Sequence, residues 1–92
     1  MFYGDDFDWD DDNVEHIARH GVAPWEAEEA ALDPEGVTIR GGRSGRLAVI
    51  GMTEAGRILV VALDREDRGV WRVVTARNAS QNEKRSYRRR RR

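Results

Sequence analysis

The chain has 92 residues, of which 39% are hydrophobic and 36% are charged, and it contains no cysteine. This length supports one small domain with a single core, and a cysteine-free chain of this size fits a reducing cytoplasm better than secretion. No apolar run is long enough to cross a bilayer, and the acidic N-terminus is unlike a secretory signal. We therefore expect one cytoplasmic domain over residues 1–92 that does not engage a membrane.

The net charge of −1 hides a strong separation of charge along the chain. Residues 1–35 hold twelve acidic residues and one basic residue, a net charge of −11, whereas the remainder holds fifteen basic and five acidic residues, a net charge of +10. This asymmetry predicts that the second half attracts phosphate groups although the pI is 6.1. The alternative is that the two halves neutralise each other within the molecule.

The first third of the chain predicts a short strand and two helices. Apolar and polar residues alternate over residues 7–9, as in a strand. Aspartates at 10–12, apolar residues at helical spacing and a closing Gly21 predict a helix over residues 11–20. Pro24 fits the first turn of a second helix, which the turn at residues 33–36 ends.

From residue 37 onward the pattern is that of β-structure. Strands are expected over residues 37–40, 47–53, 57–63 and 70–76, with a loop at 41–45. The short connections between the later strands predict an antiparallel meander. Regular alternation in the last strand places residues 71, 73, 75 and 77 on one side and residues 70, 72, 74 and 76 on the other.

The C-terminal segment predicts a third helix. Ser80 and Glu83 have the spacing of a capping box, and the basic residues 88–92 are expected to be a flexible tail that adds salt-sensitive affinity for RNA. The predicted fold is α+β, with an antiparallel sheet of three to four strands, two N-terminal helices on one face and a C-terminal helix. The tryptophans are expected in the core, unless one is exposed as a partner contact: Trp9, Trp25 and Trp71.

Two groups of motifs, one near each end of the chain, are typical of a known family. The first group is Phe7-x-Trp9-Asp10, Arg19-His20-Gly21-Val22 and Glu26-Ala27. The second group is Thr75-Ala76-Arg77-Asn78-Ala79, Glu83, Lys84-Arg85 and Tyr87. In this order they resemble the BrnT toxins, within the wider RelE-like group of bacterial toxins. The chain departs from the family pattern around Asn13 and His16, where the family often carries a lysine and an asparagine.

The resemblance implies a fold, an activity and partners. It implies the RelE-like arrangement of a sheet with N-terminal and C-terminal helices, and a ribonuclease toxin of a type II toxin–antitoxin system that needs no cofactor. The implied partners are RNA and a small antitoxin protein of the ribbon-helix-helix type. Toxin and antitoxin would form a hetero-oligomer; a dimer of the chain is the alternative.

RNA cleavage without a metal ion uses the 2′-hydroxyl of the substrate as nucleophile, and arginine suits the phosphate because its planar fork matches phosphate oxygens. Arg77, after the last strand, is the expected phosphate clamp, the alternative being a salt bridge to an N-terminal aspartate. Arg46 and Arg57 begin adjacent strands and are expected to converge on the same phosphate. Arg72 lies among valines, which indicates an open sheet face or an acidic partner. Arg85 is expected to bind RNA.

Three further residues are candidates for proton transfer. Glu83 is a candidate general base, or else the second member of the capping box. Tyr87 lies one turn later, where it either contacts the substrate or anchors the last helix. His20 is a candidate because imidazole titrates near neutral pH, the alternative being a helix C-cap. His16 and His20 have the spacing of a zinc pair but lack the other ligands, so no metal site is expected.

Three hypotheses follow from these observations. The first is a toxin endoribonuclease that acts on RNA. The second is a non-catalytic domain of the same fold that binds a protein or nucleic-acid partner. The third is a structural protein without a role in RNA chemistry, in which the charge separation builds a dimer.

Overall fold

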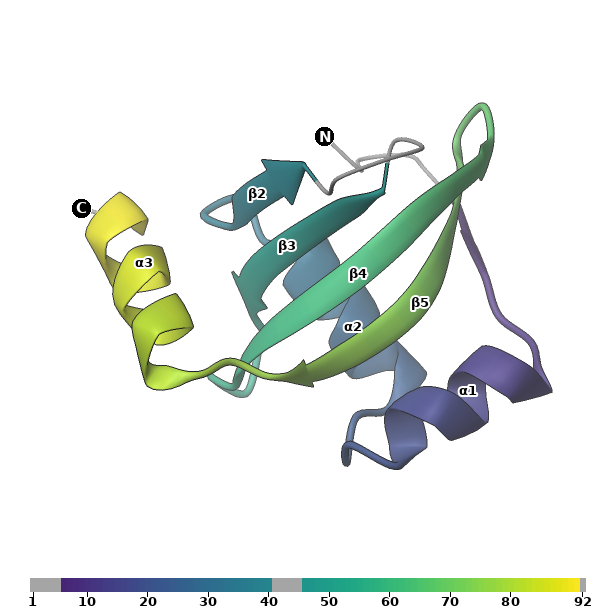
Figure 1. The fold of residues 1–92 in the computed structure, drawn as a ribbon, viewed down its shortest axis with the longest axis horizontal. Coiled ribbons are helices and arrows are strands. Elements are labelled where there is room, and N and C mark those ends of the chain that lie inside the picture. The colour runs from purple at the N-terminus through teal and green to yellow at the C-terminus, as the bar shows by residue number, and fades with distance from the viewer. Residues whose placement is uncertain (1–5, 41–45, 92) are drawn as a thin grey trace.

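The computed structural model describes residues 6–40 and 46–91, so the loop expected at residues 41–45 lies outside the described residues. The elements follow one another as β1 (Asp6–Asp8), α1 (Asp11–Ala18), α2 (Pro24–Ala31), β2 (Val37–Arg40), β3 (Leu47–Met52), β4 (Ile58–Asp67), β5 (Val70–Asn78) and α3 (Gln81–Arg91) (Figure 1). The α+β class is confirmed. No helix in this part of the chain is long and apolar enough to cross a membrane.

The sheet has five strands in the order β1-β5-β4-β3-β2. Strands β2 to β5 pair with antiparallel neighbours, as the short connections predict. Strand β1 adds a parallel partner at the edge of β5, where Phe7 is opposite Trp71. The sheet is therefore mixed, and it has more strands than the three to four that we expected.

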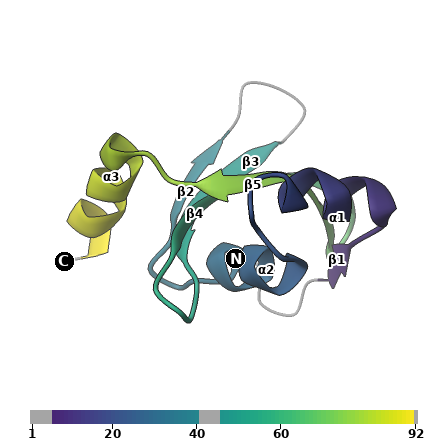
Figure 2. The ribbon, with the colours of Figure 1, turned by 90° about the horizontal axis from the view of Figure 1, so that it is seen from below.

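The helices cover opposite faces of this sheet. Val49 of β3 belongs to a core shared with α1 and α2, whereas the next residue, Ile50, packs in a second cluster with Tyr87 of α3. Because successive side chains of a strand point to opposite faces, α3 lies on the face opposite α1 and α2. Figures 1 and 2 both show α3 and α1 at opposite ends of the molecule.

Close contact between α2 and the sheet depends on a glycine in β3. A β-carbon at Gly51 would overlap the carbonyl oxygen of Ala30 in α2. The helix can approach the strand this closely only because position 51 has no side chain. Small residues on α2 complete the contact, since Ala27 and Ala30 are fully buried.

A β-bulge in β5 overturns the predicted alternation of its side chains. Leu63 of β4 pairs with Val73, whereas the preceding Ala62 pairs with Thr75, so Val74 is an extra residue in β5. Before the bulge, Trp71 and Val73 face α1 and α2, but after it Ala76 takes the buried position. The prediction that residues 71, 73, 75 and 77 share one side is therefore wrong, because Arg77 lies on the face opposite Trp71 and Val73.

Asn13 fixes the start of α1 against the edge of the sheet. Its side chain accepts a hydrogen bond from the Asp10 backbone N–H, and Asp10 accepts one from the Asn13 N–H, which makes a capping box. Its amide also donates to the carbonyl oxygens of Asp8 (3.0 Å) and Val73 (3.1 Å). Asn13 therefore supplies a hydrogen-bond donor to the Val73 carbonyl of β5 at the point where β1 ends. Only 3% of Asn13 is exposed, and these hydrogen bonds satisfy its buried amide.

The structure also gives the ends of α1 and α3 and the burial of the tryptophans. Helix α1 ends at Ala18 rather than at residue 20, with Gly21 at φ 72° just beyond it. Helix α3 runs to Arg91, and the flexibility expected of residues 88–92 stays a prediction. Trp71 is in the core as predicted, whereas Trp25 is 66% exposed, which agrees with the alternative that one tryptophan faces outward.

Candidate functional site

The strand arginines gather at the two ends of the sheet rather than at one point. Arg46 precedes β3 and Arg57 precedes β4, and these strands are antiparallel, with Leu47 opposite Leu63 and Met52 opposite Ile58. The starts of antiparallel neighbours lie at opposite ends of the sheet. The prediction that Arg46 and Arg57 converge on one phosphate is therefore wrong.

At the exit of β5, Arg77 forms a two-point ion pair with Glu83 of α3. Its Nη1 lies 2.8 Å from Oε1 and its Nη2 lies 2.9 Å from Oε2, and Nη1 also donates to the carbonyl oxygen of Asn78 at 3.1 Å. These contacts fix the plane of the guanidinium, while 45% of the Arg77 side chain stays exposed. The partner is thus the nearby Glu83 rather than the N-terminal aspartate that we considered.

Arg57 lies at the same end of the sheet as Arg77 and, like Arg77, contacts Asn78. Its Nη2 donates to the side-chain oxygen of Asn78 at 2.9 Å. Its Nη1 donates to the carbonyl oxygen of Gly21 at 2.9 Å and to the carboxylate of Glu26 at 3.0 Å. Arg57 therefore links the turn between α1 and α2 to the exit of β5, and Asn78 lies between Arg57 and Arg77.

The pKa of Glu83 bears on the choice between its two candidate roles, general base and helix cap. The hydrogen bonds from Arg77, followed by that from the Ser80 N–H, lower the pKa of Glu83 to about 2. Glu83 Oε1 accepts from the Ser80 N–H at 2.8 Å, and the Glu83 N–H donates to Ser80 Oγ at 3.2 Å, which is the predicted capping box. A carboxylate with so low a pKa is a weak base at neutral pH, so these contacts favour capping and the orientation of Arg77.

Tyr87 is positioned as an anchor for α3. Only 1% of it is exposed, and its ring packs with Ile50, Ile58 and Val60 in the second core cluster. Its hydroxyl donates to Asp33 Oδ2 at 2.6 Å, at the end of α2. This arrangement favours the anchor alternative over contact with a substrate.

The two histidines of α1 and its following turn lie beside β5. The His16 Nε2 is 3.1 Å from Thr75 Oγ1, and the ring of exposed His20 meets the His16 ring edge-on at 5.6 Å. The residue after His20 is Gly21, to which Arg57 donates. From sequence, His16 is a candidate only as half of a metal pair, and no pattern in the sequence signals its contact with Thr75. Among residues 6–40 and 46–91, no group of three or more His, Asp or Glu side chains is arranged to hold a metal ion.

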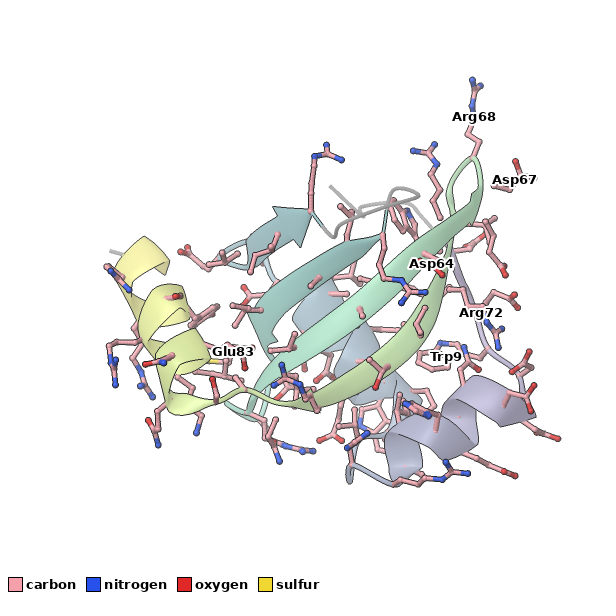
Figure 3. All side chains as sticks on the ribbon, in the orientation of Figure 1. Trp9, Asp64, Asp67, Arg68, Arg72 and Glu83 are labelled. Atoms are coloured by element: carbon pink, nitrogen blue, oxygen red, sulfur yellow. The ribbon has the colours of Figure 1, made fainter. Side chains whose placement is uncertain are left out.

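The opposite end of the sheet holds Arg46 and Arg72, each paired with carboxylates. Arg46 makes two contacts with Asp64, at 2.8 and 2.9 Å. Arg72 lies 3.0 Å from Asp10 and 3.6 Å from Asp8, so the acidic-partner alternative for Arg72 is confirmed. Figure 3 shows Asp64 and Arg72 at this end and Glu83 on α3 at the other.

Further carboxylates make the Arg72 end a poor environment for phosphate. The side chain of Asp8 raises the pKa of Glu66, as expected for neighbouring carboxyl groups. A pocket of about 510 Å³ at this end is lined by Asp12 as well as by the two ion-paired arginines. Helix α3 carries further cations: Arg85 donates to the side-chain amide oxygen of Asn82, and Arg88 and Arg89 are exposed.

Comparison with known proteins identifies the family. The model of a family described as "Ribonuclease toxin, BrnT, of type II toxin-antitoxin system" matches residues 9–83. A search of curated proteins gives no match. The matched range covers most of the chain and includes His20, Arg77 and Glu83, but ends before Arg85 and Tyr87. The chain therefore belongs to the BrnT family of ribonuclease toxins of type II toxin–antitoxin systems.

Proposed function

We propose that this chain is the toxin of a type II toxin–antitoxin system, and that it cleaves RNA in the cytoplasm at the exit of β5 without a metal ion. The observation that carries the proposal is Arg77, whose guanidinium is oriented by two contacts with Glu83 while 45% of its side chain is exposed. The partners are RNA and an antitoxin, which we propose to be of the ribbon-helix-helix type.

Arg77 acts on the phosphate at which the RNA is cut. In the reaction, the 2′-oxygen forms a bond to phosphorus and the bond from phosphorus to the 5′-oxygen breaks, which leaves a 2′,3′-cyclic phosphate and a 5′-hydroxyl. Negative charge increases on the phosphate oxygens in the transition state. A pre-oriented guanidinium stabilises that charge, which is commonly the largest contribution to catalysis.

The reaction also needs one proton removed from the 2′-hydroxyl and one delivered to the 5′-oxygen. His20 is the proposed group that takes the proton from the 2′-hydroxyl and passes it to the 5′-oxygen, because a neutral imidazole accepts a proton and its protonated form donates one. His20 is exposed on the turn that Arg57 ties to Asn78. Glu83, with a pKa of about 2, orients Arg77 rather than acting as the base. Tyr87 anchors α3.

The remaining arginines divide between RNA attraction and stability. Arg85, together with exposed Arg88 and Arg89, supports sequence-independent attraction of the RNA backbone next to Arg77. Arg57 holds the turn that carries His20. Arg46 and Arg72 are paired with carboxylates at the acidic end, so we propose that they stabilise the fold and contribute little to RNA binding.

The second candidate function is RNA binding without cleavage, which the exposed arginines of α3 favour. Expression of the chain without antitoxin distinguishes the two: the first function predicts growth arrest that weakens in Arg77→Ala. Purified protein should then cut RNA, again with loss of activity in Arg77→Ala. Full binding of RNA that stays intact would support the second function instead.

A further inference from the structure

Helix α2 presents a large apolar surface to solvent. Trp25 is 66% exposed and Leu32 is 45% exposed, and these residues lie seven positions apart, two helical turns along the same face. Isolated exposed apolar residues are ordinary, but Trp25 and Leu32, here called the apolar patch, line one groove together, as apolar residues do at binding sites.

The apolar patch lines a groove of about 520 Å³ between α2, the turn that follows it and the turn between β3 and β4. Pro34 and Met52 add apolar surface to that of Trp25 and Leu32. The charged residues that line the groove are all acidic: Glu28, Glu29, Asp33 and Glu54.

We infer that this groove is the docking surface for a cationic, amphipathic segment of the antitoxin. An apolar side chain of that segment packs against Trp25 and Leu32, and its lysines or arginines pair with the surrounding carboxylates. RNA is excluded as the occupant because the groove would repel phosphate. The inference rests on the proposed function for the identity of the partner, and on the residues of α2 for the surface.

A second copy of this chain is a poorer occupant. Its cationic segment is α3 and the residues that follow it, which contain Tyr87 as their one aromatic residue and no aliphatic side chain. Tyr87 is buried and bonded to Asp33 of its own chain. Helix α3 of a second copy therefore offers positive charge but no apolar side chain for the space between Trp25 and Leu32.

The groove is separate from the proposed cleavage site. Arg77, Glu83 and His20 are not among its lining residues. Substitutions of Trp25, Leu32, Glu28 or Glu29, which line the groove, should therefore change antitoxin binding and leave RNA cleavage as it is, which makes the two functions separable by mutation.

The test measures binding of the antitoxin encoded beside this chain, by titration calorimetry with each purified variant. Trp25→Ala should weaken binding at least tenfold, as expected for a tryptophan anchor. Leu32→Lys is a second variant, which should also weaken binding because it replaces an apolar side chain of the groove with a positive charge. Glu28→Gln with Glu29→Gln keeps the acceptor oxygens but removes two charges, and should weaken binding about threefold and reduce its salt dependence.

Matched controls lie outside the groove. Ile39→Ala removes another exposed apolar side chain, and Glu15→Gln removes another exposed charge, so both should bind the antitoxin as the unmodified chain does. RNA cleavage by each variant is measured in the same preparations. If the unmodified chain cuts no RNA but Trp25→Ala still loses the antitoxin, the docking surface stands while the proposed activity fails.

Two results would overturn the inference. One is unchanged antitoxin affinity in both Trp25→Ala and Leu32→Lys. The other is that Trp25→Ala converts a self-associated chain to a monomer in sedimentation experiments while antitoxin affinity is unchanged, which would make a second copy the occupant.

Discussion

Arg77 and Glu83 lie six residues apart and join the end of β5 to the first turn of α3 through two parallel contacts of 2.8 and 2.9 Å. The same carboxylate accepts the Ser80 N–H, so Glu83 starts the helix and orients the arginine at once. The position of Arg77 also depends on the bulge at Val74, which places Arg77 on the face of the sheet opposite α1 and α2. The position of the proposed phosphate clamp thus depends on both the strand and the helix.

Replacement of Arg77 should reduce RNA cleavage far more than stability. We expect Arg77→Ala to lower the cleavage rate by about 10²–10³-fold, as loss of one pre-oriented donor does in other enzymes. The free energy of unfolding should fall by no more than about 1 kcal/mol, because the ion pair is partly exposed. Cleavage of a defined RNA and urea denaturation measure the two effects.

Arg68→Ala is the matched control, since Arg68 lies in the turn between β4 and β5, at the end of the sheet opposite Glu83 (Figure 3). It should retain full cleavage. Arg77→Lys should recover part of the activity, because an ammonium group keeps the charge but not the planar fork. Equal rates for Arg77→Ala and the unmodified chain would exclude Arg77 as the clamp.

The low pKa of Glu83 predicts a specific loss of stability in acid. A folded-state pKa of about 2, below the ordinary 4.5, means that ionised Glu83 stabilises the fold above pH 4.5 and loses this effect as the pH falls towards 2. After solvent screening we expect about 1–2 kcal/mol. Urea denaturation from pH 6 to pH 3 should therefore narrow the stability difference between the unmodified chain and Glu83→Gln. A difference that does not change with pH would contradict the Arg77 ion pair.

Tyr87→Phe separates the anchor from a catalytic role. The variant removes the hydroxyl that donates to Asp33 and keeps the buried ring, so we expect a loss of about 1–2 kcal/mol in stability and faster hydrogen exchange in α3. Cleavage at a temperature where the variant is folded should be close to that of the unmodified chain. A large loss of cleavage with unchanged stability would instead assign the hydroxyl to the reaction.

Asn13 should be among the polar residues on which stability depends most. Asn13→Ala removes the capping contact and leaves the carbonyl oxygens of Asp8 and Val73 without this donor, which should cost about 2–3 kcal/mol. Asp12→Ala is the control, since Asp12 is the exposed neighbour in the same helix turn. Similar midpoints of thermal unfolding for the two variants would show that the buried amide is unimportant.

Local sequence signals predicted the helices and most of the sheet. Pro24 and the box of Ser80 and Glu83 marked helix starts, and short connections indicated antiparallel pairing. The parallel pairing of β1 could not be foreseen, because three alternating residues do not specify a partner strand. The bulge at Val74 was equally hidden, since it arises from the register between β4 and β5 and leaves no turn residue in the sequence.

Arg77, Glu83 and His20 are candidates from the sequence, and their roles at the site stay predictions. The pairing of charges could not be predicted, because it depends on which strand ends share an edge. Antiparallel pairing of β3 and β4 is enough to place Arg46 and Arg57 at opposite ends of the sheet. Because the short connections predict that pairing, the separation of the two arginines can be predicted from the sequence. His16 was missed as a neighbour of β5, because nothing in the sequence links it to Thr75.

The central claim is that Arg77 serves an RNA cleavage in which the 2′-hydroxyl of the substrate is the nucleophile. The most direct measurement is incubation of purified protein with a defined RNA in excess EDTA, followed by identification of the new ends by mass spectrometry. We expect cleavage that leaves 2′,3′-cyclic phosphate and 5′-hydroxyl ends and that is lost in Arg77→Ala. Cleavage that requires a divalent cation, or that leaves 3′-hydroxyl and 5′-phosphate ends, would contradict it.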